Sequence, residues 1–338
     1  MKILIAGGHG AFRDMIIDRF HREKHEIYTV SGELSDAVSS KYTNYNFSLT
    51  DEKLKFIMYS ISPEAVIFLG AFDEQYNFES EQKASMDYLS GLSNLLVNVS
   101  TLNIPRFTYL SSYSVYGTEK KETLTEGHEK SPEDLRSLII ADGEALCMEF
   151  NKLYNMRAVI LRFSDVYGAL STKNSDFCDV IFREIMNPFR DPALPFKPPV
   201  EKHLSPIYVS DAVDAIYKTI NYDSEKATGG IYNVSSQNAD LSYIYNKIKK
   251  LCGVEYSYTY SRIRERIGVI PRNDAPAAAD DETPPPPPID LTVDHTAFSE
   301  KYSYKPIVNI DAGLERMFRG MRKRSKQEKK VKDKSGGS

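Results

Sequence analysis

The chain has little cysteine, no long apolar run and no strong excess of charge of one sign. Its 338 residues include 3 cysteines, Cys147, Cys178 and Cys252, which are far apart and show neither a metal-binding nor a CxxC spacing. This argues against a disulfide framework and favours a reducing compartment. No apolar run reaches the length of a membrane span, and the first strand-like residues follow Met1 directly. We therefore expect a soluble cytoplasmic protein without a membrane partner.

Charge is nearly balanced except at the end of the chain. The formal net charge of -4 and the pI near 6.0 give no general reason to expect a nucleic-acid partner. Met321 to Lys334 holds 8 Lys or Arg residues against Glu328 and Asp333, a local charge of +6. We expect residues 320–338 to form a solvated, disordered basic tail, with an acidic partner or a nucleic-acid contact as the alternative.

Apolar segments of strand length alternate with amphipathic helical segments up to residue 168. Strand-like runs cover residues 3–6, 26–30 and 65–69, and further runs end near Leu110 and Phe163. Helical spacing of apolar residues separates them. This alternation predicts an α/β fold with a Rossmann-like, doubly wound parallel sheet that helices cover on both faces.

The alternation of strand-like and helical segments ends after Gly168, and the sequence becomes richer in proline. Residues 169–319 are predicted to form a smaller, loop-rich lobe from which some segments return to the sheet. Within it, residues 271–290 include five consecutive prolines. We expect an extended, exposed loop insertion there, and a ligand for a proline-binding module is the alternative.

A glycine-rich loop joins the first strand to the first helix. Gly7, Gly8 and Gly10 permit a sharp turn, as in a GxxGxxG loop whose helix N-terminus holds a pyrophosphate. Arg13 stands at the third glycine position. It is a surface replacement, an obstruction to the pyrophosphate, or a cation that reaches a phosphate. Because the helix N-terminus still offers unpaired backbone donors, we expect the loop to bind a phosphorylated ligand.

Four further motifs stand in a recognisable order. They are LSSYSVYG at 110–117, LRFSDVYG at 161–168, IYVSDAVDAI at 207–216 and YSYKPIVNIDAGLERM at 302–317. With the glycine loop they resemble the extended short-chain dehydrogenase/reductase family, the nucleotide-sugar epimerases and dehydratases, over nearly the whole chain. The resemblance implies that residues 1–168 are mainly a domain binding NAD or NADP, and that residues 169–319 bind a nucleotide-sugar type substrate.

Family members transfer hydride with the help of a Ser, a Tyr and a Lys. The tyrosinate takes a proton from a substrate hydroxyl, and the lysine lowers the pKa of the tyrosine. Ser112 falls on the serine position. Anchored by Pro132, the YxxSKxxxE pattern places Arg136 at the tyrosine and Ile140 at the lysine. Arginine stays protonated and isoleucine cannot tune a pKa. The usual hydride-transfer dyad is therefore predicted to be missing. The expected cofactor is NAD or NADP, and loss of the cofactor is the alternative.

The resemblance nevertheless assigns a set of candidate site residues. Ser112, Tyr113 and Arg136 are expected to contact the substrate at the catalytic position. The expected cofactor-binding residues are Gly7, Gly8, His9, Gly10, Ala11, Phe12, Arg13, Ser31, Ser48, Gly70 and Ala71. Lys202, His203 and Arg272 are expected to bind the substrate, and the histidines show no metal-ligand spacing.

Several polar positions depart from the family pattern. Ser31, Gly32 and Glu33 match neither the acidic residue that holds an adenine ribose nor the basic residues that hold a 2'-phosphate. Ser48 stands where an Asp commonly contacts adenine, and Tyr88 where an Asn is expected.

Two hypotheses follow from these departures. The first is an epimerase/dehydratase-like protein that binds a nucleotide sugar, with altered or lost chemistry. The second is a catalytically inactive partner or regulatory subunit. Residues 81–99 and 132–154 are expected to form the helices through which it pairs, as a homodimer or as a heterodimer with a related subunit.

Overall fold

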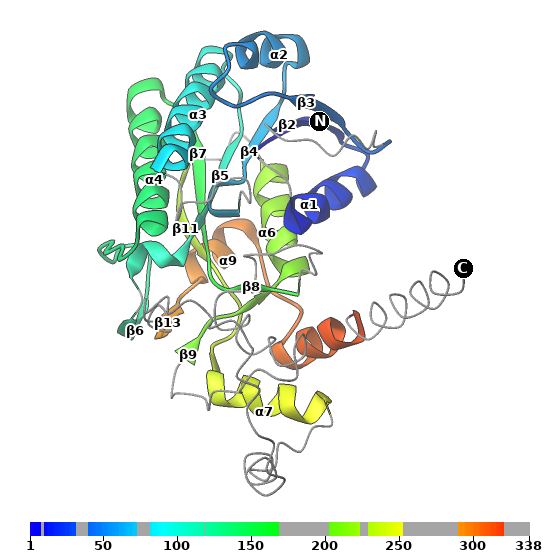
Figure 1. The fold of residues 1–338 in the computed structure, drawn as a ribbon, viewed down its shortest axis with the longest axis vertical. Coiled ribbons are helices and arrows are strands. Elements are labelled where there is room, and N and C mark those ends of the chain that lie inside the picture. Colours follow the sequence, from blue (N-terminus) through cyan, green and yellow to red (C-terminus); the bar gives the residue numbers. More distant parts are fainter. Residues whose placement is uncertain are drawn as a thin grey trace, which may run out of the picture.

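A parallel sheet of seven strands forms the centre of the computed structural model, which describes residues 1–7, 10–31, 40–72, 82–117, 119–168, 203–223, 229–252 and 290–320 (Figure 1). In spatial order the strands are β11 (Gly230–Val234), β7 (Ala158–Phe163), β5 (Phe107–Ser112), β4 (Ala65–Phe68), β1 (Lys2–Ala6), β2 (Glu26–Ser31) and β3 (Thr43–Asn46). Each neighbouring pair is parallel. The predicted doubly wound sheet is confirmed.

Helices cover both faces of this sheet. One face packs against α2 (Lys53–Ile61), α3 (Gln82–Thr101) and α4 (Leu135–Tyr154). The other packs against α1 (Ala11–Arg22), α6 (Val209–Asn221) and α9 (Thr296–Tyr302). Strands such as AVIF and AVILRF are buried throughout because helices cover both of their faces.

The sheet direction determines where a ligand site is expected. The chain steps from β1 to β2 on one side, whereas β4 lies on the other side of β1. Ligands of doubly wound sheets bind at the carboxyl edge of such a switch point. Gly7 follows β1, Ser31 ends β2, Gly70 follows β4 and Ser112 ends β5, so these predicted site residues share that edge.

Smaller elements lie beyond the carboxyl edge. Two short 3-10 helices, η1 (Gly70–Phe72) and η2 (Tyr113–Tyr116), follow β4 and β5. The paired short strands are β8 (Val166–Tyr167) with β10 (Ile207–Tyr208), β9 (His203–Leu204) with β12 (Ala239–Asp240), and β6 (Glu119–Leu124) with β13 (Asp290–Val293). A third apolar cluster joins α7 (Leu241–Cys252) to the helical residues 310–320.

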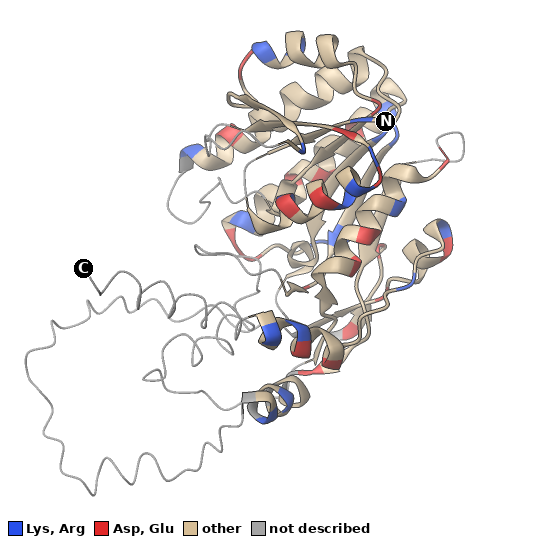
Figure 2. Ribbon diagram, turned by 90° about the vertical axis from the view of Figure 1, so that its right-hand side faces the viewer, with Lys and Arg blue, Asp and Glu red and all other residues tan. Residues whose placement is uncertain are grey.

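Charged side chains of both signs are intermixed over the described elements (Figure 2). No helix among the residues that the structure describes has the length and apolar character needed to cross a membrane.

Candidate functional site

The described glycines of the first loop have the backbone that the sequence predicts. Gly7 has φ 119° and Gly10 has φ 145°, a region that side chains rarely adopt. The Gly7 N–H donates to Val30 O at 3.1 Å, which ties the turn to β2. Since α1 begins directly after Gly10, the backbone donors of its first turn lie at the carboxyl edge of β1. Gly8 and His9 lie outside the described residues.

Arg13 is buried in the first turn of α1. Its side chain is 9% exposed, its guanidinium lies 5.9 Å from the centre of the Tyr42 ring, and its Nη2 donates to Asp14 Oδ1 at 3.4 Å. The interpretation of Arg13 as a chance surface replacement is therefore wrong, because its side chain is buried. A permanent positive charge lies beside the predicted pyrophosphate position.

The other predicted cofactor residues divide between core and surface. Phe12 is fully buried, and its ring packs 4.9 Å from Phe72. Ser31 is buried at the end of β2. Ser48 is exposed in the turn before α2, where its Oγ lies 2.9 Å from Thr50 Oγ1. Their predicted contacts with a dinucleotide stay predictions.

Gly70 permits a close approach between β4 and β5. Its φ is +55°, and a Cβ there would lie 2.1 Å from Leu110 O. Only glycine fits this position without displacing the backbone. The 3-10 turn that it begins presents the carbonyl of Ala71, which accepts a hydrogen bond from α4.

The donor of that hydrogen bond is Arg136, the residue at the tyrosine position. Arg136 lies in the first turn of α4, whose start is fixed by a capping box between Asp134 and Ser137. From there its Nη2 donates to Ala71 O at 2.6 Å. The arginine thus fastens α4 to the η1 turn.

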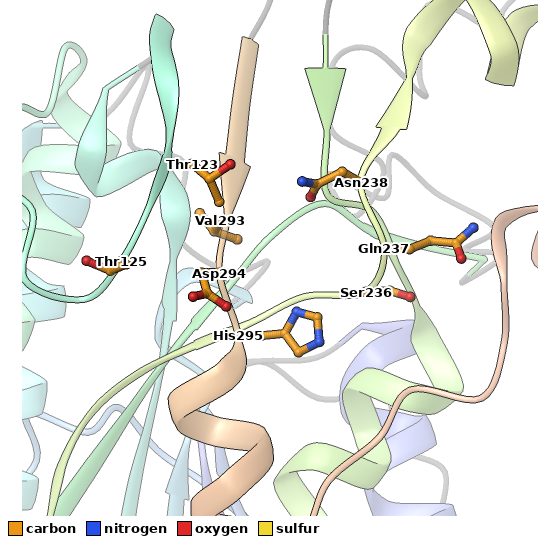
Figure 3. Close-up of a pocket in the computed structure, with 8 residues that line it drawn as sticks. All are labelled: Thr123, Thr125, Ser236, Gln237, Asn238, Val293, Asp294 and His295. Carbon is orange, nitrogen blue, oxygen red and sulfur yellow. The ribbon is translucent and has the colours of Figure 1, made fainter.

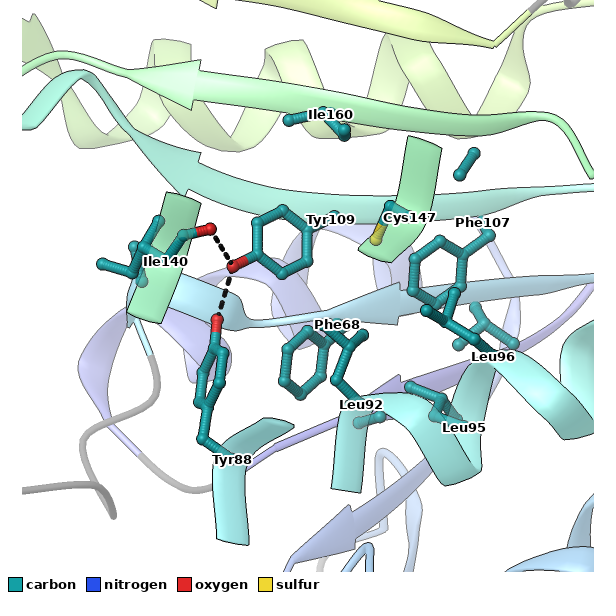
Figure 4. Close-up of a cluster of buried hydrophobic side chains, with 14 of the residues drawn as sticks. Phe68, Tyr88, Leu92, Leu95, Leu96, Phe107, Tyr109, Ile140, Cys147 and Ile160 are labelled. Atoms are coloured by element: carbon teal, nitrogen blue, oxygen red, sulfur yellow. Dashed lines mark hydrogen bonds between the residues drawn. The ribbon is translucent and has the colours of Figure 1, made fainter. Parts of the chain in front are cut away.

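Ile140, the residue at the lysine position, is fully buried, and it lies next to the paired tyrosines Tyr88 and Tyr109 (Figure 4). Tyr109 donates from its hydroxyl to Ile140 O at 3.0 Å, and its oxygen lies 2.7 Å from the hydroxyl of Tyr88. Gly143 accommodates this arrangement, since a Cβ there would lie 2.4 Å from the Tyr109 hydroxyl. Burial, followed by the neighbouring Tyr88, raises the pKa of Tyr109 well above its usual value. Tyr109 therefore stays protonated at neutral pH.

Ser112 lies at the carboxyl edge of the sheet, and its predicted substrate contact stays a prediction. It ends β5 and caps η2, and its Oγ accepts the N–H of Ser114 at 3.1 Å. Because that bond uses a lone pair, the Ser112 hydroxyl proton can be donated to a ligand oxygen. Tyr113 is 3% exposed and packs in the apolar cluster beneath α4. Its predicted substrate contact stays a prediction.

Sequence reasoning missed a buried ion pair behind this turn. Arg162 of β7 donates to Glu144 of α4 through Nε at 2.8 Å and Nη2 at 2.6 Å. Burial disfavours the charge of Arg162, but the hydrogen bonds and charge of Glu144 outweigh it, and the pKa of Arg162 rises. Ser111 also donates to Glu144, at 2.6 Å. The signal was available, since one arginine interrupts the apolar strand AVILRF.

The same pair supports the η2 turn. Arg162 Nη1 donates to the Tyr116 hydroxyl at 2.7 Å, and that hydroxyl donates to Asn233 Oδ1, 2.9 Å away. Lys130 Nζ lies 3.4 Å from the Glu144 carboxylate. Strands β5, β7 and β11 and helix α4 therefore hold the turn after Ser112 through one polar network.

The predicted substrate-binding residues are only partly described. His203 is exposed on β9, with its Nε2 3.4 Å from Asp240 Oδ1. Lys202 and Arg272 lie outside the described residues. Across the described ranges, no group of three or more His, Cys, Asp or Glu side chains could hold a metal ion.

Residues 3–235 match the model of the NAD dependent epimerase/dehydratase family. The chain belongs to this family. One curated relative, Protein CapI of Staphylococcus aureus, is 26% identical over 183 residues. That match covers 50% of this chain and spans 55% of the length of the relative.

Solved structures of nucleotide-sugar enzymes share the fold. UDP-glucose 4-epimerase of Thermotoga maritima, solved with UDP-glucose, has a TM-score of 0.74 at 18% identity and covers 96% of this chain and 99% of its own. dTDP-glucose 4,6-dehydratase of Bacillus anthracis, solved with NAD, has a TM-score of 0.72 at 15% identity, with 96% and 97% covered. UDP-N-acetylglucosamine 4-epimerase of Methanobrevibacter ruminantium reaches 0.75 at 17% identity, with 96% and 98% covered.

Proposed function

We propose that this chain binds a nucleotide sugar at the carboxyl edge of the sheet beside Ser112, and that the usual tyrosine and lysine hydride transfer is altered or lost. The observation that carries the proposal is the start of α4. There Arg136 donates to Ala71 O at 2.6 Å and Ile140 is fully buried. An arginine cannot take the substrate proton, and a buried isoleucine cannot lower the pKa of a base.

The residues fit one end of an NAD molecule better than the other. At the pyrophosphate end, Gly7 and Gly10 keep the tight turn and the first turn of α1 offers backbone donors. When bound, NAD supplies the hydride acceptor in family chemistry. At the expected nicotinamide end, Ile140 and Tyr88 replace the family's polar residues. We infer that a phosphorylated nucleotide is held here without the ordinary redox step.

Ser112 is the side chain best placed to contact the sugar. Its hydroxyl donates while Ser114 occupies one of its lone pairs. The Arg162 and Glu144 network holds the turn in which it lies. In this proposal Ser112 orients a substrate hydroxyl and takes no proton from it. Residues 169–319 supply the remaining contacts, with His203, Lys202 and Arg272 toward the diphosphate.

Calorimetry tests the binding directly. We expect saturable heat with UDP-glucose, UDP-glucuronic acid or dTDP-glucose, and weaker binding in Ser112→Ala. Ser100→Ala on α3 is the control, since its hydroxyl donates to Val97 O within its own helix. Mass spectrometry of the denatured protein, backed by titration, identifies any NAD or NADP that it carries. Failure of every nucleotide sugar to bind would overturn the proposal.

A second candidate function is that of a catalytically inactive partner or regulatory subunit. Helices α3 and α4 pack side by side. Both carry apolar side chains that are exposed and are not buried against the sheet. They include Met86, Val97, Leu138 and Leu153. These helices match the predicted pairing helices within three residues at each end. A strictly monomeric mass in light scattering, with no partner recovered, would count against this candidate.

A further inference from the structure

A polar hollow lies where β6 and β13 meet the segment after β11 (Figure 3). Its volume is about 280 Å³. The residues that line it are Thr123, Thr125, Ser236, Gln237, Asn238, Val293, Asp294 and His295. None of them belongs to the predicted cofactor, catalytic or substrate-binding residues.

The lining favours a neutral ligand that is rich in hydroxyl groups. Seven of the eight lining side chains carry a hydroxyl, amide, carboxylate or imidazole group, and none of the eight is Lys or Arg. An anion would therefore meet the Asp294 carboxylate without a compensating cation. A hydroxyl group both donates and accepts hydrogen bonds, as this mixture of donors and acceptors requires.

One buried serine fixes the orientation of Asn238. Ser205 is fully buried, and its Oγ accepts the Val293 N–H at 3.0 Å and donates to Asn238 Oδ1 at 2.6 Å. Since the amide oxygen of Asn238 accepts this hydrogen bond, the amide nitrogen is the atom that can donate to a ligand. Ser205 thus links two lining residues, Val293 and Asn238, and holds the Asn238 amide in one orientation.

A second buried serine fixes His295. Ser235 Oγ lies 2.9 Å from His295 Nδ1 and donates to Val293 O at 3.3 Å. We assign the Ser235 proton to Val293 O, so that Ser235 accepts from Nδ1–H and Nε2 of His295 is left as an acceptor. Figure 3 shows the ring reaching from the end of β13 toward the segment after β11. Burial lowers the pKa of His295 against the opposing charges of Asp294 and Glu126, so the ring is neutral at neutral pH.

We propose that this hollow is a second ligand site for a neutral, hydroxyl-rich molecule of monosaccharide size, in which Asn238 donates to the ligand and His295 accepts from it. The volume suits only a small ligand, since it lies just below the usual range for binding pockets. Two buried serines preorganise the donor and the acceptor, which reduces the entropy that binding costs.

Ligand-observed NMR titration of the full-length protein tests the site. The probes are free glucose, galactose and N-acetylglucosamine, with inorganic phosphate as the anionic comparison. We expect saturable binding of at least one sugar and none of phosphate. His295→Phe and Asn238→Leu are each expected to weaken sugar binding about tenfold, as loss of a buried hydrogen bond requires. His21→Asn, at an exposed position on α1, is the control and should bind like the unchanged protein.

Acid pH provides an independent readout of His295. Protonation removes the Nε2 acceptor, so sugar binding should be steady at neutral pH and fall in acid, at a pH below the midpoint of an ordinary histidine. Circular dichroism of each variant confirms folding. The proposal would be overturned if no sugar bound saturably up to tens of millimolar. It would also be overturned if His295→Phe and Asn238→Leu bound sugar as tightly as the unchanged protein. Because these probes carry no nucleotide, failure here leaves nucleotide-sugar binding beside Ser112 unaffected.

Discussion

The charge pair between Glu144 and Arg162 stabilises the turn that carries Ser112. Both side chains are buried, and the guanidinium meets the carboxylate through two hydrogen bonds. Breaking such a pair leaves an uncompensated buried charge.

Glu144→Gln should therefore lower the free energy of unfolding by about 3 kcal/mol. Urea denaturation measures the change. Glu149→Gln is the matched control on the same helix, because Glu149 is exposed and its partner Lys152 lies in solvent. Equal effects of the two substitutions would contradict the role given to the buried pair.

Gly70 sets the distance between β4 and β5. Gly70→Ala places a Cβ 2.1 Å from the Leu110 carbonyl oxygen at a φ of +55°, so the backbone must move. We expect a loss of more than about 2 kcal/mol of stability. Gly127→Ala is the control, because the nearest atom to a Cβ there lies 4.0 Å away. Thermal denaturation of the two variants checks this, and a Gly70→Ala protein as stable as Gly127→Ala would refute it.

The sequence predicts the identity of site residues better than their contacts. Arg136 and Ile140 are found on α4 where the motif spacing places them. The pairing of Tyr88 with Tyr109 was not predictable, because it depends on how α3 packs over β5. The burial of Arg13 was missed for the same reason, since Tyr42 reaches it from another segment.

Helices α3 and α4 present a shared apolar surface. Met86 and Val97 on α3, and Leu138 and Leu153 on α4, are all at least 45% exposed. The helices contact each other along the same face of the sheet, so a partner could cover both at once.

Leu138→Asp should abolish pairing through this surface, because burying an aspartate in an apolar interface is costly. Light scattering is expected to show a dimer for the unchanged protein and a monomer for Leu138→Asp. Phe56→Asp on α2 is the control, since Phe56 is 69% exposed outside the two helices. A dimer that survives Leu138→Asp would contradict pairing through α3 and α4.

Local patterns predicted the regular elements of the sheet with little error. The apolar runs at 3–6 and 65–69 correspond to β1 and β4 within one or two residues. The pairing of β6 with β13 could not be predicted, because it joins segments more than 160 residues apart through two short strands. The polar hollow depends on that pairing, which is why no motif indicated it.

The change of sequence character at Gly168 leads us to propose two regions, residues 1–168 and residues 169–319. Strand β11 comes from the second region and lies beside β7, so some of that region does return to the sheet. We propose that residues 1–168 hold the nucleotide turn and residues 169–319 the sugar. Residues 271–289 of the proline-rich segment and 321–338 of the basic tail lie outside the described residues.

The most direct test is chromatography of a nucleotide sugar after incubation with the full-length protein and NAD. UDP-glucose, UDP-glucuronic acid and dTDP-glucose are the substrates, and NADH absorbance is followed in the same samples. If Arg136 and Ile140 have removed the hydride-transfer dyad, each sugar should return unchanged and no NADH should appear. Conversion that scales with protein concentration and disappears in Ser112→Ala would contradict the loss of hydride transfer, since it would require a working base elsewhere beside Ser112.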